Sequence, residues 1–263
     1  MLTSVQVPES AEEARAALQD GAVPLGGGTH LMARAADRAD GDLRLVSLRK
    51  AGLGGIDVEG DTVTLGAATT LAEIEDDDRL GHLAGCVRSI ASPPVRGLAT
   101  VAGNLFVPQP YGDLAVALLA LDAELDVLGA DGARSESLER VIEDGLRPGD
   151  LVTRVRFTAT DAFRFYKASR RRLNSASIVT VAARIVVRDG LVEDVRLALG
   201  GVARRVVRAA GAERVLRGAP LNAEVVARAA EAAAIDPFDD AYASAWYRAR
   251  VFPVHLRRAL LGA

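Results

Sequence analysis

The stretch ATVAGNLFVPQPYGD, residues 99–113, joins a turn of small residues at positions 101–104 to two prolines, a glycine and a single carboxylate, Asp113. Its side chains carry too little bulk for a core strand, although apolar runs flank it. Because glycine and alanine leave the backbone open, a ligand can lie against main-chain N–H groups, which favour anions and phosphates above all. An ordinary surface turn explains the same residues, since short glycine motifs recur by chance.

Another glycine-containing loop, GGGTHL at residues 26–31, comes earlier in the chain and is called the first loop below. It follows a short apolar run at 23–25 that we expect to form a strand. Three glycines after a strand are costly in chain entropy, which is expected where the backbone takes positive φ or touches a ligand. The loop is not the dinucleotide fingerprint, because the GxGxxG spacing fails. It is not a Walker loop either, because no Lys-Ser/Thr pair follows the glycines.

The composition indicates a large globular protein. At 263 residues, with 49% hydrophobic and 25% charged positions, the chain can bury a substantial core and form more than one domain. A net charge of −3 excludes the global basic field typical of nucleic-acid-binding proteins. Arginine runs at 170–172 and 204–205 are interpreted as solvated faces or partner contacts. We expect a cytoplasmic protein without a membrane span, since no apolar run is long enough and no signal-like segment opens the chain.

The cysteine and histidine content argues against a metal centre in this chain. The single cysteine, Cys86, lies in an apolar window and is expected to be a small core residue. Any iron–sulfur cluster must therefore sit on another chain. The three histidines, His30, His82 and His255, lack ligand-like spacing, so we predict no metal site.

The first half of the chain reads as alternating short helices and strands. Ser10 and Glu13 form a capping box that predicts a short helix as the first element, ending at Gly21. Thr70 and Glu73 form a second capping box. Strands are expected at 43–48, 56–58, 63–65 and 151–157, a hairpin at 124–137, and helices after residue 70, at 82–90 and, buried on all sides, at 114–121.

The second half begins near residues 158–161, where we place a domain boundary. Beyond it, the pattern predicts strands followed by a helical cluster, which is an α+β layout. The expected strands are 163–168, 177–187 and 191–199, and the expected helices are 209–216, 221–234 and 243–261.

Together, the two loops and Asp113 resemble the FAD-binding medium subunits of molybdenum hydroxylases, the family of carbon monoxide dehydrogenase and xanthine dehydrogenase. The resemblance covers almost the whole chain, and several motifs in the right order are more specific than any one of them. The family's motifs are approximately AGGTDL, RxxATIGGN, SPxxDLxPALLALDA, FxKxxxRxxxxxSIV and LALGGVAxxxxRAxxAExxLxG, and they match residues 26–31, 96–104, 109–123, 165–179 and 197–218.

This resemblance implies an α+β fold in two domains. Residues 1–159 would form a p-cresol methylhydroxylase-type FAD-binding domain, made of two α+β subdomains at about 1–52 and 53–159. Residues 160–263 would form a small C-terminal α+β domain of the carbon monoxide dehydrogenase flavoprotein type, with an antiparallel sheet plus helices. The division agrees with the element pattern.

The resemblance also implies a non-covalent FAD site. The first loop would offer backbone N–H groups to the pyrophosphate and ribityl chain, and Asp113 would accept a hydrogen bond from a cofactor hydroxyl or ring donor. Lys167 would supply a cation beside the flavin, although an ordinary strand lysine explains it equally well. Tyr111 either shields the flavin or fills the turn. The implied cofactor residues are Leu25, Gly26, Gly27, Gly28, Thr29, His30, Leu31, Thr100, Ala102, Gly103, Asn104, Asp113, Val152 and Lys167.

By resemblance, the chain is an oxidoreductase subunit that passes electrons from [2Fe-2S] clusters on a small partner subunit, through FAD, to NAD or another acceptor. The substrate would be oxidised at a molybdenum cofactor on a large subunit, and no side chain of this chain is a catalytic residue. Two alternatives stay open, a stand-alone flavin oxidase or dehydrogenase of the same fold, and a non-catalytic scaffold that has lost FAD. Two departures from the family pattern bear on them: Ala102 replaces a glycine, and His30 replaces Asp or Ser.

Overall fold

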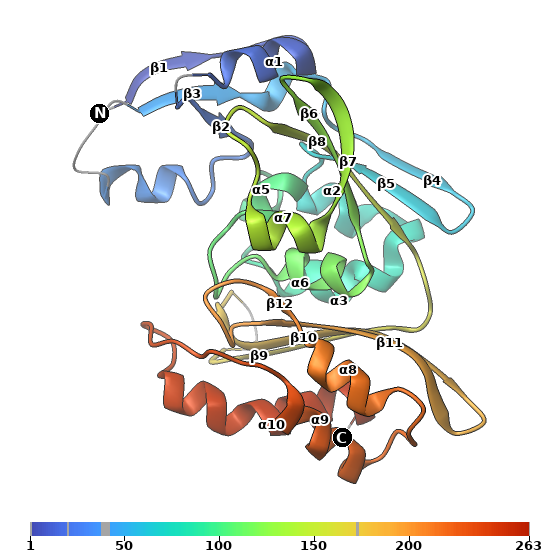
Figure 1. Ribbon diagram of the computed structural model, residues 1–263. Coiled ribbons are helices and arrows are strands. Elements are labelled where there is room, and N and C mark those ends of the chain that lie inside the picture. The colour runs from blue at the N-terminus through green and yellow to red at the C-terminus, as the bar shows by residue number, and fades with distance from the viewer. Residues whose placement is uncertain (1, 20, 38–42, 172–173, 263) are drawn as a thin grey trace. The chain divides into compact units, whose positions relative to one another are not determined.

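The computed structural model describes residues 2–19, 21–37, 43–171 and 174–262 (Figure 1). The chain forms two compact units, each assembled from separate segments. Unit 1 comprises Met1–Arg79, Ser92–Val107 and Ala123–Thr158, and unit 2 comprises Leu80–Ala91, Pro108–Asp122 and Ala159–Ala263. Two segments of the first half thus group with the C-terminal part, and the domain boundary near residue 159 stays a prediction.

A three-stranded parallel sheet with the order β1-β3-β2 opens unit 1. The prediction that a helix comes first is wrong, because β1 (Leu2–Gln6) precedes α1 (Ala11–Ala17). The residues of β1 are largely exposed and carry no clear hydrophobic alternation, so no pattern marked the strand. Helix α1 begins at its predicted cap, Ser10, and ends before Gly21. The other two strands are β2 (Val23–Leu25) and β3 (Leu43–Ser47).

A five-stranded antiparallel sheet with the order β4-β5-β8-β6-β7 forms the rest of the unit 1 framework. Val155 and Phe157 are buried, as the alternation in their strand predicts. The predicted hairpin is confirmed, and a helix that the sequence analysis did not predict follows it, α7 (Leu138–Asp144). The strands are β4 (Ile56–Glu59), β5 (Thr62–Gly66), β6 (Glu124–Gly129), β7 (Gly132–Ser137) and β8 (Leu151–Thr158).

Short helices connect the strands of unit 1. Helix α2 (Leu71–Asp76) has the complete capping box predicted from Thr70 and Glu73. Pro93 also opens a helix, α4 (Pro93–Arg96), since proline at the first position lacks only an N–H that the helix leaves unpaired. The remaining short helices along the chain are α5 (Val101–Leu105), η1 (Met32–Asp37), η2 (Leu48–Lys50) and η3 (Asp78–Leu83).

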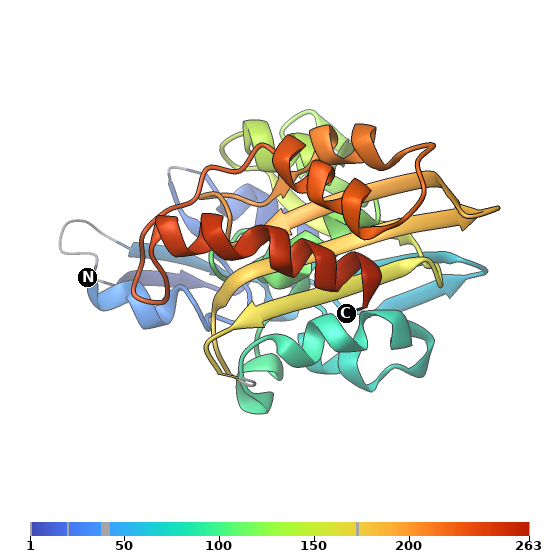
Figure 2. The ribbon, with the colours of Figure 1, turned by 90° about the horizontal axis from the view of Figure 1, so that it is seen from below.

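Unit 2 is built on a four-stranded antiparallel sheet with the order β12-β11-β10-β9. Helix α6 is buried along its whole length and packs on β10 and β11, while α10 packs on β9 and β10 from the other face (Figures 1 and 2). The predicted long antiparallel pair, the buried helix and the helical cluster are confirmed. The elements are α3 (Ala84–Ser89), α6 (Asp113–Ala120), β9 (Phe163–Ser169), β10 (Ser177–Arg188), β11 (Leu191–Gly200), β12 (Val207–Arg208), α8 (Ala210–Leu216), α9 (Ala223–Ala232) and α10 (Ala245–Leu261).

Candidate functional site

The first loop, residues 26–31, leaves β2 and leads into η1, and all six of its residues are half-buried. No group in the described part of the chain accepts a hydrogen bond from the backbone N–H of Gly27, Gly28 or Thr29. Consecutive N–H groups without a protein acceptor are uncommon in half-buried residues, and such groups favour a bound anion. The loop therefore fits the phosphate groups of a nucleotide cofactor.

Close packing within unit 1 explains two of the three glycines in this loop. A Cβ atom on Gly26 would lie 2.5 Å from the hydroxyl oxygen of Thr100, and one on Gly27 would overlap the carbonyl group of Leu98. Gly28 has φ +70°, a left-handed conformation that favours glycine. The sequence predicted a close approach or positive φ. The group that approaches Gly26 and Gly27 is the second loop of the chain itself.

The second loop, residues 98–104, is not the turn predicted from its small residues but the start of helix α5, which Thr100 caps. The main-chain N–H groups of residues 101–104 are already used inside unit 1. Gly103 itself is exposed. The N–H groups of Val101 and Ala102 donate to the carbonyls of Thr69 and Ala67, at 2.8 and 3.0 Å. Within the first turn of α5, the Asn104 N–H donates to the Thr100 carbonyl at 2.9 Å, and the Gly103 N–H donates to Thr100 Oγ1 at 3.2 Å.

A strand-like contact holds the second loop in this position. Thr70 and Thr100 form an isolated antiparallel bridge, and the Leu71 N–H donates to the Ala99 carbonyl at 2.8 Å. Arg96, which is 6% exposed, donates from Nε to a carboxylate oxygen of Glu75 at 2.7 Å. The arginine of the RxxA motif thus ties helix α4 to α2 and fixes the approach to the loop.

Asp113, the first residue of α6, lies in a buried network in unit 2. Its Oδ2 is 2.8 Å from Lys167 Nζ, and its Oδ1 accepts from the hydroxyls of Ser177 and Thr180, each at 2.6 Å. Lys167 also donates to the carbonyl of Ser89 at 2.8 Å. Both charged side chains are less than a tenth exposed. The structure therefore brings Asp113 and Lys167 together, with the carboxylate engaged by three donors from the chain itself.

The two hydroxyl partners of Asp113 were not predicted from the sequence. Ser177 and Thr180 are the polar residues of the apolar first half of strand β10, residues 177–183, and both are fully buried. A buried hydroxyl needs a hydrogen-bond partner, so this pattern was the available signal. Lys167 was also noticeable in the sequence, because arginine supplies nearly all the positive charge of this chain. Only two of the 32 Lys and Arg side chains are lysines, and the other one, Lys50, is exposed.

The remaining predicted residues have varied surroundings. Leu25 ends β2 half-buried, and Val152 is 4% exposed within β8. Burial, with the positive charge of Arg34, lowers the pKa of His30 below its usual value and so favours the neutral imidazole. The Tyr111 hydroxyl lies 2.7 Å from that of Tyr242, and the two rings meet edge to face. Tyr111 thus packs within unit 2.

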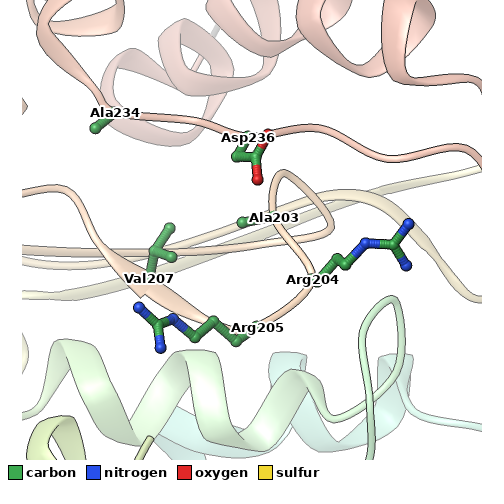
Figure 3. Close-up of a pocket in the computed structure, with 6 residues that line it drawn as sticks. All are labelled: Ala203, Arg204, Arg205, Val207, Ala234 and Asp236. Carbon is green, nitrogen blue, oxygen red and sulfur yellow. The ribbon is translucent and has the colours of Figure 1, made fainter. Parts of the chain in front are cut away.

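A cavity of about 360 Å³ opens in unit 2 beside the arginine run at 204–205 (Figure 3). Arg204 and Arg205 point to different sides of it, and Asp236 adds a negative charge (Figure 3). Arg204 also lies over the ring of Phe238, 5.7 Å from its centroid. Because the two guanidinium groups diverge, they do not form a converging anion site. Their exposure agrees with the expected solvated face.

The described residues offer neither a metal-binding cluster nor a membrane-spanning helix. They contain no group of three or more His, Cys, Asp or Glu side chains arranged to hold a metal ion. Within the same residues, no helix has the length and apolar character needed to cross a membrane. Cys86 is buried, as expected, and burial raises the pKa of its thiol well above the usual value.

Comparison with known proteins assigns both parts of the chain. Residues 2–158 match the family described as the FAD binding domain in molybdopterin dehydrogenase. Residues 164–263 match the CO dehydrogenase flavoprotein C-terminal domain. The carbon monoxide dehydrogenase medium chain of Afipia carboxidovorans is 30% identical over 92% of this chain and 89% of its own length. The glyceraldehyde dehydrogenase medium chain of Sulfolobus acidocaldarius is 29% identical, covering 75% and 74% of the two chains.

Solved structures agree with this assignment. Carbon monoxide dehydrogenase from Hydrogenophaga pseudoflava, in a form that lacks the Mo-pyranopterin moiety, superposes with a TM-score of 0.93 at 26% identity, covering 100% of this chain and 97% of its own. Quinoline 2-oxidoreductase from Pseudomonas putida 86 superposes with a TM-score of 0.87 at 25% identity, covering 100% and 97%. The predicted α+β fold is confirmed. Because both family domains match in order and the relatives cover nearly the whole chain, this chain belongs to the FAD-binding subunits of the molybdenum hydroxylase family.

Proposed function

We propose that this chain holds FAD non-covalently and passes electrons from iron–sulfur clusters on a partner subunit to NAD or another acceptor. Several relatives are named as medium chains or FAD subunits, which supports an assembly of several subunits. In this assembly a large subunit carries the molybdenum cofactor, where the substrate is oxidised, and a small subunit carries [2Fe-2S] clusters. FAD supplies the electron-accepting chemistry when bound, while this chain supplies binding and electrostatics.

The observation that carries the proposal is the set of N–H groups at Gly27, Gly28 and Thr29 that have no acceptor among the described residues. Such groups act as a fixed partial positive charge, which suits a pyrophosphate. Arg34 follows in η1 and adds a full positive charge close to His30. We therefore assign the pyrophosphate to the first loop.

Exposed apolar side chains next to the two loops support a ligand with a large apolar part. Met32 directly follows the first loop and is 45% exposed. Leu98 begins the second loop, Phe106 follows helix α5, and the two side chains are 58% and 50% exposed. An apolar border beside polar N–H groups is typical of sites that bind a nucleotide joined to an aromatic ring system. This combination favours FAD over inorganic phosphate.

Asp113 and Lys167 receive distinct roles in the proposal. Because Asp113 is engaged by three donors of its own chain, we propose that it holds Lys167 rather than contacting the cofactor directly. Lys167 then contributes a fixed positive charge to the flavin environment, which favours negative charge on the bound cofactor. The role of Lys167 rests on the motif resemblance, and the other cofactor contacts predicted at Thr100, Asn104 and Val152 stay predictions.

The test compares two glycines of similar backbone conformation in unit 1. Gly28 (φ +70°) lies in the first loop, and Gly21 (φ +76°) lies in an open turn with no atom within 4 Å of an added Cβ. Alanine at either position costs about 1 kcal/mol of stability through the left-handed conformation. At Gly28 the new Cβ would also lie 3.1 Å from Met32 Cγ and 3.2 Å from Leu25 Cδ1, the ends of two flexible side chains. The Gly28→Ala chain should bind FAD at least about tenfold more weakly in a fluorescence titration, a loss of about 1.4 kcal/mol. The Gly21→Ala chain should bind FAD as the unmodified chain does.

Equal FAD affinity in the two variants would remove the first loop from the site. A purified chain that takes up no FAD would contradict the proposal as a whole. The acceptor is tested separately: the FAD-loaded chain is photoreduced without oxygen and mixed with NAD, and recovery of the oxidised flavin spectrum identifies NAD as an acceptor. No recovery with NAD, but recovery with a quinone or dye, assigns the acceptor to another class.

A further inference from the structure

Arg248 on α10 is completely buried and makes hydrogen bonds in two directions. Its Nη1 lies 3.0, 2.6 and 2.8 Å from the carbonyl oxygens of Ser177, Ile178 and Gly201. Its Nη2 donates to Asp240 Oδ2 at 2.6 Å. A fully buried guanidinium is costly to desolvate, so it is retained where its planar donors hold several acceptors at once.

The backbone segments that Arg248 holds are those that contact the PQPYGD segment. The Ser177 N–H donates to the carbonyl of Pro110 at 3.2 Å, and the Gly201 N–H donates to Gln109 Oε1 at 2.6 Å. The Ser177 hydroxyl donates to Asp113 Oδ1. Both anchors of residues 109–113 therefore depend on backbone positions that the Arg248 guanidinium fixes.

The two glycines of the LALGGVA motif, Gly200 and Gly201, leave room for the close contacts around Arg248 and Gln109. Gly201 has φ +74°, and a Cβ atom there would lie 2.5 Å from the Ile178 carbonyl oxygen and 3.1 Å from Arg248 Nη1. A Cβ on Gly200 would lie 3.1 Å from Gln109 Oε1. The carboxylate of Asp240 is itself held in place by the N–H groups of Tyr242 and Ala243.

We infer that Arg248 is a positioning residue for the Asp113–Lys167 ion pair, acting through Ser177, Ile178 and Gly201. The guanidinium fixes the backbone at the start of strand β10 and in the turn after β11. These two segments in turn fix the position of the Asp113 carboxylate. Asp113 in turn holds the Lys167 ammonium, which is less than a tenth exposed. The functional meaning of this chain of contacts rests on the proposed function, in which Lys167 contributes to the flavin environment.

The scarcity of lysine makes the inference directly testable. Lys50 is exposed and Lys167 is buried, so the two lysines should react with an acylating reagent at different rates. Peptide mass spectrometry after competitive acylation measures the labelling of Lys167 relative to that of Lys50, which serves as the internal standard. The test variant is Arg248→Lys, which keeps the charge but loses the planar fork. The matched control is Arg250→Lys, at an exposed position on the same helix.

We expect the Lys167:Lys50 labelling ratio to rise at least about tenfold in Arg248→Lys, because the buried pair loses its fixed geometry. The ratio should stay unchanged in Arg250→Lys. In the FAD-loaded protein, the visible flavin absorbance should shift in the first variant and not in the control, which a purely structural role would not predict. An unchanged ratio in a folded Arg248→Lys chain overturns the inference.

If Arg248→Lys does not fold, Asp240→Asn carries the test, since it keeps Arg248 and removes only its counter-ion. The ratio should then rise severalfold, and an unchanged ratio again overturns the inference. The proposed function fails in a different way, because a chain that takes up no FAD still has a measurable Lys167:Lys50 ratio. Tight FAD binding with an unchanged ratio overturns the positioning role alone.

Discussion

The first loop of unit 1 and the Asp113 network of unit 2 both carry family motifs, yet they use their polar groups in opposite ways. In the first loop, the N–H groups of Gly27, Gly28 and Thr29 have no acceptor among the described residues. In the network, Asp113 and Lys167 are engaged by groups of their own chain. The difference separates N–H groups that lack an acceptor among the described residues, as a ligand site requires, from a buried charge pair whose partners the protein itself supplies.

The second loop lies between these two cases and shows why glycine alone is a poor marker of a ligand site. Its N–H groups at residues 101–104 are all paired, although its sequence looks as open as that of the first loop. Gly26 and Gly27 are required because this second loop comes close to them. A glycine can therefore make room for the chain as well as for a cofactor.

The largest expected effect concerns the contact between the two loops. Gly27→Ala should lower the free energy of unfolding by about 4 kcal/mol or more, because the new methyl group overlaps a backbone carbonyl that cannot rotate away. Gly54→Ala is the matched control in unit 1, where an added Cβ meets no atom within 4 Å. The control should change stability by less than about 1 kcal/mol. Urea denaturation of both variants checks this, and a mild effect of Gly27→Ala would mean that the loops are not in contact.

Breaking the ion pair should have the next largest effect. Lys167→Met leaves Asp113 buried without a counter-ion, which should cost about 3 kcal/mol. Lys50→Met, at the only other lysine, should change stability by less than about 0.5 kcal/mol. Adding Asp113→Asn to Lys167→Met should recover part of the loss in a double-mutant cycle. Equal effects at the two lysines would contradict the buried network.

A smaller effect is expected at Ala102, where the family has glycine. The Ala102 N–H already donates to the Ala67 carbonyl, and the residue is part of helix α5. Ala102→Gly should therefore cost about 0.5 kcal/mol of stability through helix entropy. FAD affinity should stay unchanged in the same titration used for Gly28→Ala. A gain of FAD binding would instead favour the alternative in which the chain is a scaffold that has lost its cofactor.

The smallest expected effect is a difference in acid sensitivity between the units. Burial lowers the pKa of His82 and His255 in unit 2 and of His30 in unit 1 below the ordinary value of 6.5. The unfolded chain then takes up protons before the folded one as the pH falls through that value, so stability present above pH 6.5 is lost below it. Hydrogen exchange at pH 7.5 and 5.5 should show the greater loss of protection in unit 2. An equal loss of protection in the two units would mean that titratable groups other than these histidines cause the acid sensitivity.

Most secondary structure could be predicted because its signals are local. The capping box of Thr70 and Glu73, the alternation around Val155 and the uniformly apolar run of α6 each indicated the element that formed. Strand β1 was not predicted, because it is largely exposed and its residues show no alternation of apolar and polar side chains. The turn expected at residues 101–104 proved to be helical because Thr100 caps it, a small-residue sequence being compatible with either conformation.

The sequence by itself determined the family, the two loops and most of the elements, because motifs and hydrophobic periodicity depend on neighbouring residues. The tertiary structure decided which N–H groups remain open, since the acceptors for the second loop come from Ala67 and Thr69. It also decided that Asp113 pairs with Lys167, which is 54 positions further along the chain. Likewise, Arg248 binds the carbonyl of Ser177, and these two residues are 71 positions apart in the sequence. Such partners are set by the path of the chain in space, which no local pattern encodes.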